Sequence, residues 1–430
     1  MTKMKSKIPF SPPDMSEEEA KEVKEAILLG WITTGPRTKK LEAQISEYVG
    51  TVKTGCLSSA TAAMEMMLHL LDVQPEDEVI VPAYTYTATA SVTQHVGCRL
   101  VMVDSQKDNV EMDYELLEQA ITERTKVVMP VDIAGIVADY DRVYEIVERK
   151  KSLFRPANAL QAKIGRIVVV ADSAHSFGAV RKGKKAGAIA DFSAFSFHAV
   201  KNFTTAEGGA LTWKLPFGNE MVPTNIDYMP IVPKKEDETW NEMLYRISQL
   251  FSLHGQNKDA LAKTKVGMWE YDIIGPWYKC NMTDIMASLG LVQMRRYPKM
   301  LDRRQEIVAR YNAALDGLNV VLLNHKDTEH CSSHHLYMVR LPGKSREEVN
   351  RVMEQMAERG IATNVHFKPL PMMTAYKALG FDIADYPNAY HLFENEITLP
   401  LYTRLTDEEV DYVITNFVDI IKNLWKDYST

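Results

Sequence analysis

Cysteine is scarce in this chain of 430 residues, which contains four. They lie far apart in four different segments, without a Cys-x-x-Cys spacing, at Cys56, Cys98, Cys280 and Cys331. Disulfide frameworks and structural zinc sites both need paired or closely spaced cysteines. We therefore expect reduced thiols, no metal site and a cytoplasmic protein.

Long hydrophobic runs and an excess of basic charge are also lacking. No stretch of eighteen apolar residues occurs, which argues against a membrane-spanning helix. The basic N-terminus is followed by Ile8-Pro9-Phe10-Ser11-Pro12-Pro13, where a signal peptide needs an apolar stretch. The net charge of -7 provides no basic field to attract phosphate backbones. We expect neither a membrane nor a nucleic-acid partner.

The remaining composition is that of a globular protein, with 46% apolar and 25% charged residues. Short apolar runs alternate with helical patterns, and the candidate strands lie at 79–81, 100–103, 127–129, 167–170 and 192–195. Continuous Val and Ile runs without polar alternation indicate strands that are buried on both faces. The sequence therefore predicts an α/β fold whose central sheet is mostly parallel and flanked by helices.

Helix signals extend this pattern over both ends of the chain. Helices are predicted from Ser16 to Gly30, over 36–48, near 61–72, 113–121 and 139–150, over 297–318 and 345–359, and from Thr406 onward. Further strands are predicted near 336–341 and 363–367. We predict a large domain, residues 1–295, with insertions near 150–166 and 214–250, the second of which could form a lid, and a smaller C-terminal α/β domain, residues 296–430.

Lys201 is the most informative residue. It lies between two strand-like runs, 192–195 and 209–213. An amine on a turn between buried strands is partly desolvated, so its pKa falls and the neutral nucleophile becomes accessible. Most lysines are solvated surface charges, so a chemical role for Lys201 needs support from other segments.

Asp172 directly follows the apolar run 167–171. A carboxylate at the end of a buried strand is costly unless it is paired with a cation or a metal. A protonated pyridinium nitrogen would be a suitable partner. A magnesium-binding aspartate and a helix cap are the competing interpretations, and Asp172 by itself does not decide among them.

Two further segments have both a ligand-binding and a structural interpretation. Ser58-Ser59-Ala60-Thr61 places small hydroxyl residues before a predicted helix. N–H groups and the helix dipole at such a position suit a phosphate, but taken alone the segment favours a plain N-cap. Ser196 would be a further phosphate donor. Tyr86, after the strand 79–81, could stack on a planar heteroaromatic cofactor or belong to the core.

Together these segments resemble a known family. Lys201 in Ser-Phe-His-x-x-Lys-x-x-Thr-x-x-Glu-Gly-Gly, Asp172 in Asp-Ser-Ala-His, and Ser59-Ala60-Thr61 resemble the sugar aminotransferases of the DegT/DnrJ/EryC1/StrS family. The resemblance runs over 33–402 and is greatest, around Lys201, to the UDP-4-amino-4-deoxy-L-arabinose–oxoglutarate aminotransferase branch. It implies a fold-type I enzyme dependent on pyridoxal 5'-phosphate (PLP), which acts on nucleotide sugars in cell-surface polysaccharide biosynthesis.

The same resemblance implies roles for individual residues. Lys201 would form the Schiff base with PLP, with pyridoxamine phosphate (PMP) as intermediate, and Asp172 would pair with the pyridine nitrogen. The other cofactor-binding residues would be Ser59, Ala60, Thr61 and Ser196 at the phosphate, Tyr86 stacked on the ring, His175 near the ring face and phenolic oxygen, and Asn281 lent by a neighbouring subunit. The substrate contacts would be His366 and Thr34. A lent Asn281 implies a homodimer with shared active sites.

The implied activity is a ping-pong transfer of an amino group, from glutamate by family analogy, to a 4-keto or 3-keto sugar nucleotide. The chain has Asp132-Ile133-Ala134-Gly135 where many members carry His-Leu-Tyr-Gly, which leaves the sugar open. A sugar dehydratase of this family has histidine in place of the Schiff-base lysine, so Lys201 favours transamination. The sequence also leaves open a cyclitol or amino-acid aminotransferase and a non-catalytic regulatory module.

Overall fold

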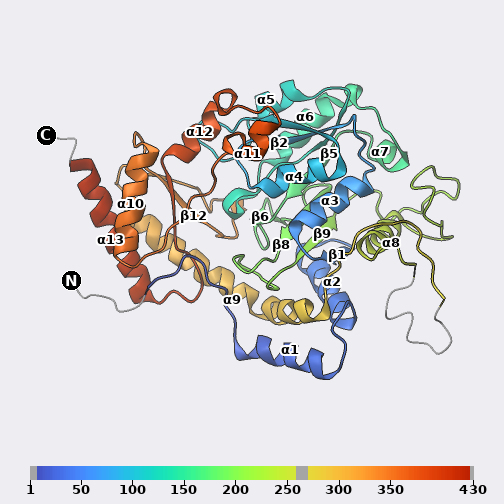
Figure 1. Ribbon diagram of the computed structural model, residues 1–430, viewed down its shortest axis with the longest axis horizontal. Helices are drawn as coiled ribbons and strands as arrows, with labels where there is room; N and C mark the ends of the chain where they lie inside the picture. The colour runs from blue at the N-terminus through green and yellow to red at the C-terminus, as the bar shows by residue number, and fades with distance from the viewer. Residues whose placement is uncertain (1–6, 258–269, 427–430) are drawn as a thin grey trace.

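The computed structural model describes residues 7–257 and 270–426 (Figure 1). A seven-stranded sheet forms its centre, in the order β1 (Thr54–Leu57), β9 (Gly209–Trp213), β8 (Phe192–Ser196), β5 (Val168–Asp172), β4 (Thr125–Val128), β2 (Glu78–Pro82) and β3 (Arg99–Val103). The strands from β8 to β3 are parallel to one another, and β9 runs antiparallel to both of its neighbours. The predicted, mostly parallel α/β sheet is confirmed.

Side chains of the central strands alternate between two hydrophobic layers, as the pleat of a strand requires. Val127 and Val168 belong to one buried cluster, whereas Val128 and Val169 belong to the other. Helices α3 (Ala60–Leu70), α4 (Thr87–Val96), α7 (Ala159–Ile164) and α8 (Trp240–Ser252) cover the first face, and α2 (Pro36–Val49), α5 (Tyr114–Ala120), α6 (Tyr140–Arg149) and part of α9 (Asp284–Leu315) cover the second. Burial on both faces explains the uninterrupted Val and Ile runs.

Local signals give most helix ends correctly. Helix α1 (Glu17–Leu28) starts with the capping box of Ser16 and Glu19, and α2 ends at Gly50, which has the left-handed φ of 83°. The predicted insertions both contain a helix, α7 in 150–166 and the start of α8 in 214–250. Buried Gln161 on α7 donates to the carbonyl of Leu71 over 2.7 Å, so the first insertion packs against the body of the protein.

The long helix α9 begins at Asp284, where Thr283 caps it by accepting a hydrogen bond from the Met286 N–H. The predicted start at 297 was wrong. Pro298 lies inside the helix and cannot donate to the preceding turn, but burial of Leu291, Tyr297 and Met300 on one side of α9 outweighs that loss. The helix runs through residue 295, so the predicted domain boundary falls within it.

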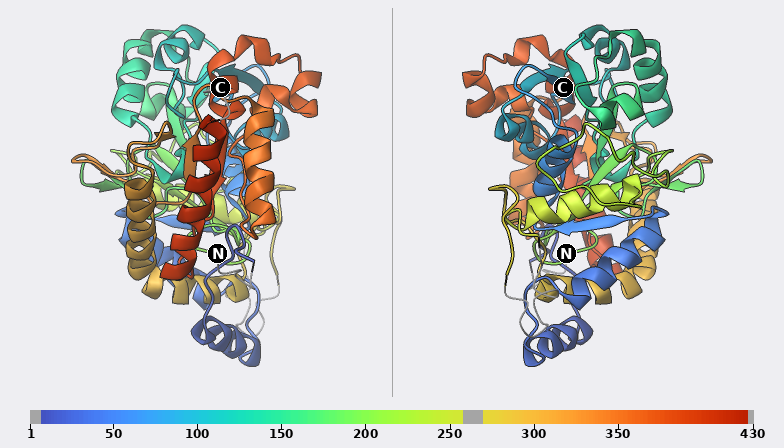
Figure 2. Two further views of the ribbon diagram at one scale, coloured as in Figure 1. Left: turned by 90° about the vertical axis from the view of Figure 1, so that its left-hand side faces the viewer. Right: turned by 90° about the vertical axis from the view of Figure 1, so that its right-hand side faces the viewer.

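The C-terminal part has its own sheet and core. Strands β10 (Val321–Leu322), β12 (Tyr337–Arg340) and β13 (Glu396–Leu399) pair antiparallel, and α10 (Arg346–Glu358) and α13 (Asp407–Lys426) pack beside each other against them (Figure 2). Ile8, from the N-terminal end, is buried in the same core. We propose two structural units that share α9, rather than a division at residue 295.

The predicted strand at 363–367 was wrong. Only Asn364 bridges to Thr398, and no strand forms there. The chain turns away because the His366 N–H donates to buried Glu396 over 2.9 Å, while the side chains of His366 and Phe367 line a cavity. Side chains that line the cavity replace continued strand pairing at this point.

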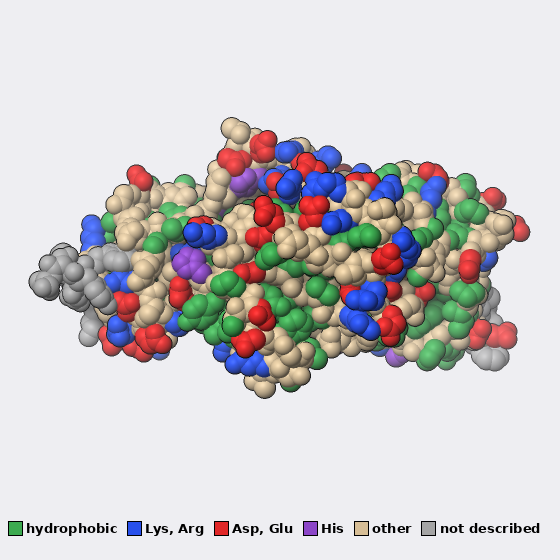
Figure 3. Space-filling model, turned by 90° about the horizontal axis from the view of Figure 1, so that it is seen from above, with side chains coloured by type: hydrophobic (Ala, Val, Ile, Leu, Met, Phe, Trp, Pro, Cys, Tyr) green, Lys and Arg blue, Asp and Glu red, His purple; other side chains and the backbone are tan. Residues whose placement is uncertain are grey.

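Smaller elements complete the described fold. A third sheet contains β6 (Val180–Arg181), β7 (Lys184–Lys185) and β11 (His330–Cys331), and the short helices are α11 (Thr374–Ala378), α12 (Pro387–Glu394), η1 (Ile133–Gly135), η2 (Lys151–Leu153), η4 (Leu370–Met372) and η5 (Ile383–Asp385). Among the described helices, none combines the length and hydropathy that crossing a bilayer requires. Acidic and basic side chains are interspersed on the face in Figure 3.

Candidate active site

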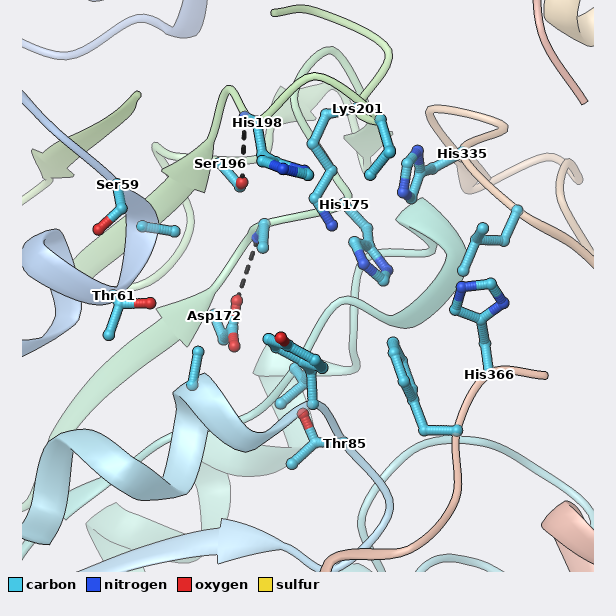
Figure 4. A pocket seen from close by; sticks show the side chains of 18 of the residues that line it. Ser59, Thr61, Thr85, Asp172, His175, Ser196, His198, Lys201, His335 and His366 are labelled. Atoms are coloured by element: carbon cyan, nitrogen blue, oxygen red, sulfur yellow. Dashed lines mark hydrogen bonds between the residues drawn. The ribbon is translucent and has the colours of Figure 1, made fainter. Parts of the chain in front are cut away.

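A cavity of about 450 Å³ opens at the carboxyl ends of the parallel strands. Strand β5 ends in Asp172 and β8 ends in Ser196, and the carboxyl ends of parallel strands meet at one edge of a sheet. Nearly all predicted site residues line this cavity: Ser59, Ala60, Thr61, Tyr86, Asp172, His175, Ser196, Lys201 and His366 (Figure 4). The order of the strands therefore brings together residues that are far apart in the sequence.

Asp172 is buried at the floor of the cavity, with 4% of its surface exposed. Its Oδ2 accepts a hydrogen bond from the Thr89 hydroxyl over 2.6 Å, and its Oδ1 accepts one from the Ala174 N–H over 3.1 Å. Burial raises the pKa of Asp172, while these hydrogen bonds and the charge of Lys201 oppose the rise. A carboxylate held in this way can pair with a cationic group in the cavity.

Lys201 extends from the loop after β8 into the same cavity (Figure 4). Its backbone N–H donates to the His198 carbonyl over 2.9 Å, which closes the turn. Burial lowers the pKa of Lys201 to about 8, although the charge of Asp172 opposes this shift. Within 7–257 and 270–426, the Lys201 Nζ has no hydrogen-bond or ion-pair partner. The amine is therefore a poised nucleophile and proton carrier.

The N-terminus of α3 faces the cavity opposite Lys201. Ser59 caps the helix by accepting from the Ala62 N–H over 3.0 Å, and the first N–H groups of any helix lack intrahelical acceptors. Gly209 on β9 allows the backbone at the start of α3 to lie close to it, because a Cβ on Gly209 would lie 2.3 Å from the carbonyl carbon of Ser59. The resulting cradle of N–H groups and hydroxyls suits a phosphate.

Three aromatic rings form another wall. His175 is half-buried, and its Nδ1 is one of the enclosed polar atoms without a partner in the described chain. Desolvation, followed by the charge of Lys201, holds the pKa of His175 well below the usual value. The ring of Tyr86 is 62% exposed and lies 6.2 Å from that of Phe367. Phe367 also stacks on His175, with centroids 5.9 Å apart.

His366 is oriented by two polar neighbours. Its Nδ1 lies 2.9 Å from the Thr398 hydroxyl, which donates to Glu396 over 2.5 Å. Burial lowers the pKa of His366 to about 3 and raises that of Glu396 to about 8. His366 therefore meets a ligand as a neutral ring.

Asn281 and Thr34 do not line this cavity. They contact each other instead, because the Asn281 amide donates to the Thr34 hydroxyl over 2.5 Å, and Thr34 donates to the Met282 carbonyl over 2.6 Å. The second insertion, 214–250, contributes no residue to the cavity lining either.

Sequence reasoning missed several residues that the fold brings to the site: Phe10, Thr89, Glu207 and His335. Thr89 carries no local signal, since it meets Asp172 only when the fold brings the start of α4 near the end of β5. Glu207 and Gly208 stand within the lysine motif and also line the cavity. No cluster of three or more metal-ligating side chains occurs in the described residues.

The cavity fits PLP on three observations. Its buried carboxylate can hold a proton on a pyridine nitrogen, its amine can condense with an aldehyde, and its helix N-terminus, opened by Gly209, can hold a phosphate. The unpaired Nδ1 of His175 further indicates a missing hydrogen-bond partner in the cavity.

Comparisons with known proteins agree with this chemistry. The model of the DegT/DnrJ/EryC1/StrS aminotransferase family matches residues 13–418. The spore coat polysaccharide biosynthesis protein SpsC of Bacillus subtilis is 32% identical over 423 residues, which cover 96% of this chain and 97% of SpsC.

Solved structures of the putative sugar aminotransferase Spr1654 from Streptococcus pneumoniae are also similar. The PMP form is 55% identical with a TM-score of 0.89, covering 97% of this chain and 99% of that chain. The PLP form is 54% identical with a TM-score of 0.88, at the same coverage. These matches confirm the predicted fold-type I architecture and the predicted cofactor. The chain therefore belongs to the DegT/DnrJ/EryC1/StrS aminotransferase family and is a PLP-dependent aminotransferase.

Proposed function

We propose that the protein transfers an amino group from glutamate to the 4-keto or 3-keto group of a nucleotide-linked sugar. The supporting observation is the amine of Lys201, with its pKa lowered to about 8, in one cavity with the buried carboxylate of Asp172. The names of SpsC and Spr1654 refer to polysaccharide biosynthesis and to sugar amination. They support a role in making cell-surface polysaccharides.

Asp172 and Lys201 divide the chemical work in this proposal. When bound, the cofactor supplies an electron sink for the charge that develops at the carbon that loses its proton. Asp172 keeps the ring nitrogen protonated. Lys201 would hold the cofactor through its aldehyde and, as a free amine, would move a proton between the two carbons at which it is lost and gained. The same steps run in reverse with the keto-sugar, which makes the exchange ping-pong.

The remaining predicted residues would position the ligands. Ser59, Ala60, Thr61 and Ser196 would hold the phosphate, Tyr86 would stack on the ring, and His175 would lie near the ring face and the phenolic oxygen. His366 would contact the sugar substrate from this chain, whereas Thr34, which binds Asn281 outside the cavity, would contact the substrate of a neighbouring subunit. Ser59 and Thr61 lie on one side of Asp172 and Lys201 lies on the other (Figure 4), which supports this order of phosphate, ring and aldehyde.

We propose further that the working unit is a homodimer with shared sites. Lys201 is the one lysine among the residues that line the cavity in the described chain, and no arginine lines it. A phosphate and the two carboxylates of glutamate need more positive or donor groups than one chain supplies. In this proposal Asn281, which binds Thr34 outside the cavity of its own chain, serves the cofactor phosphate of a neighbouring subunit. The free thiols of the four cysteines support a cytoplasmic location.

Borohydride reduction of the holoenzyme tests the central link. Mass analysis should find the pyridoxyl group on the peptide that contains Lys201, and Lys201→Ala should lose both the label and the absorbance of the bound aldehyde. Its turnover should fall by roughly 10²–10⁴-fold, the usual contribution of a positioned proton carrier.

Lys185→Ala is a matched control, because Lys185 is also partly buried with a pKa lowered by burial, but it lies over the Tyr48 ring outside the cavity. Label on another lysine, or unchanged turnover in Lys201→Ala, would overturn the assignment.

Incubation with glutamate and a panel of keto-sugar nucleotides then tests the substrate. An aminated sugar supports the proposal, and a deoxy product without net amine transfer identifies a dehydratase.

A further inference from the structure

His335 is a cavity residue that no local motif pointed to. It lies close to η1 in space and precedes β12 in the chain, and 5% of its surface is exposed. Its backbone is held by Arg304, whose Nη1 donates to the carbonyls of His334 and His335 over 3.2 and 3.4 Å. His335 lines the same wall as His175, and the two ring centroids are 4.4 Å apart (Figure 4).

The tautomer of His335 follows from its hydrogen bonds. The Asn202 Nδ2 donates to the Ser333 carbonyl over 2.6 Å, and a carbonyl can only accept. The amide of Asn202 must therefore turn its oxygen towards His335, whose Nδ1 lies 2.9 Å from that oxygen. An amide oxygen only accepts as well, so the proton of His335 is on Nδ1.

The other ring nitrogen is consequently a bare acceptor. Within the described residues, Nε2 of His335 has no hydrogen-bond partner, and the ring lines the cavity. Burial, followed by the positive charges around it, holds the pKa of His335 well below the usual value, so the ring stays neutral. Asn202, which selects this tautomer, is the residue next to Lys201 in the chain.

We propose that His335 is a positioning residue for Lys201: its bare Nε2 accepts a hydrogen bond from the ammonium group of Lys201 whenever that group is free. Among the residues that line the cavity, Lys201 is the cationic donor in the described chain. Its Nζ has three protons when charged and no partner in the described residues. The inference rests on the proposed role of Lys201 and adds a residue that holds its amine between half-reactions.

Several titratable groups face Lys201 and set the background for this contact: Asp172 at the end of β5, His175 after it, His366 from the C-terminal part, and Arg304 behind His335. The histidines are neutral, so Asp172 is the charged partner. A neutral acceptor such as His335 Nε2 stabilises the ammonium form of Lys201 without neutralising Asp172.

Two variants separate this contact from a packing role. His335→Asn can keep the hydrogen bond to Asn202 but has no group at the position of Nε2. His335→Gln can place an amide oxygen near that position. Competitive labelling of the apoprotein with acetic anhydride at a series of pH values, read by peptide mass analysis, gives the pKa of Lys201 against exposed Lys151 as an internal reference.

We expect His335→Asn to lower the pKa of Lys201 by about one unit, since a hydrogen bond to a charged group has about that effect. His335→Gln should keep it within a few tenths of a unit of wild type. In the holoenzyme, His335→Asn should slow the half-reactions with glutamate and with keto-sugar by a similar factor, because both use the free amine, with little change in KM.

Equal shifts in the two variants, or no shift in either, would overturn the proposal. If His335→Asn does not fold, Asn202→Ala is the deciding variant. It removes the acceptor that keeps the proton of His335 on Nδ1, so it should lower the pKa of Lys201 by a smaller amount. An unchanged pKa of Lys201 in Asn202→Ala would also overturn the proposal. Labelling measures the free amine of Lys201 without cofactor, whereas borohydride reduction measures its bond to the cofactor. The proposal for His335 can therefore be wrong while the role of Lys201 is correct, and the role of Lys201 can be wrong while His335 does contact its amine.

Discussion

Two buried aspartates lie at opposite ends of the same pair of strands, and they differ in whether a cationic side chain binds them. Asp191 precedes β8, and both of its oxygens bind Arg166, which precedes β5, over 2.7 and 2.9 Å. Asp191 also accepts from the Val169 N–H over 2.9 Å. Asp172, at the far end of β5, has two neutral donors and faces a lysine with which it forms no ion pair in the described chain.

The difference separates a structural end of the sheet from a reactive end. At the Asp191 end, burial acts to lower the pKa of Arg166, but the hydrogen bonds and charge of Asp191 outweigh it and raise that pKa, so Arg166 stays charged and paired with Asp191. At the Asp172 end, the lowered pKa of Lys201 and the unpaired Nδ1 of His175 mark groups that lack partners. Buried polar groups without partners are costly, and a ligand site is the usual reason to keep them.

The largest expected effect is on activity at the reactive end. Asp172→Asn should keep the fold, because an amide can hold the contacts with Thr89 and Ala174, but should lose roughly 10²–10⁴-fold in turnover, since the ring nitrogen is no longer held protonated. Absorbance titration with PLP and steady-state rates measure it. Near wild-type turnover would contradict the role given to Asp172.

The next effect is on stability at the structural end. Asp191→Asn removes the carboxylate that binds both terminal guanidinium nitrogens of half-buried Arg166 and leaves it only the more exposed Glu148, 3.3 Å away, so it should cost up to about 3–5 kcal/mol. Chemical unfolding measures this loss, and turnover per folded molecule should change little. The double variant Arg166→Met with Asp191→Leu should be less destabilised than the single one. If Asp191→Asn unfolds like wild type, the two ends do not differ as described.

A pH effect should follow from Lys201 in the apoprotein. Its pKa falls from 10.5 in the unfolded chain to about 8 in the fold. Between these pH values the unfolded chain binds a proton that the folded chain has released, so the free energy of unfolding should rise with pH. Below pH 8 both forms bind the proton, and the buried charge lowers the free energy of unfolding by its full amount. Relative to that of Lys201→Met, the free energy of unfolding of the wild-type apoprotein should increase by on the order of 3 kcal/mol from pH 8 to 10.5. A flat difference would contradict the lowered pKa.

The smallest effect is expected at an exposed ion pair on α6. The Arg142 Nη1 and Glu145 Oε2 are 3.0 Å apart, with both side chains largely in solvent. Glu145→Gln should change the free energy of unfolding by less than about 0.5 kcal/mol and leave turnover unaffected. A cost similar to that of Asp191→Asn would show that burial is not what distinguishes the pairs.

Much of the fold and the centre of the site could be predicted because their signals are local. The unbroken Val and Ile runs reveal strands buried on both faces, capping boxes and Gly50 reveal helix ends, and Lys201 stands in a motif that marks a family. What could not be predicted depends on contacts between distant segments. Helix α9 extends through Pro298 because its buried side supports it, and 363–367 turns away from its sheet to meet buried Glu396.

The amino-acid sequence by itself determined the layer arrangement of the sheet, the cofactor-binding motif and the presence of an amine and a carboxylate in one site. Tertiary structure alone decided which groups reach that amine. Asn202 and His335 are 133 residues apart in the chain, and Thr89 and Asp172 are 83 apart. A hydrogen bond depends on the positions and directions of two groups in space. The order of residues along the chain does not give these until the strands lie side by side in the fold.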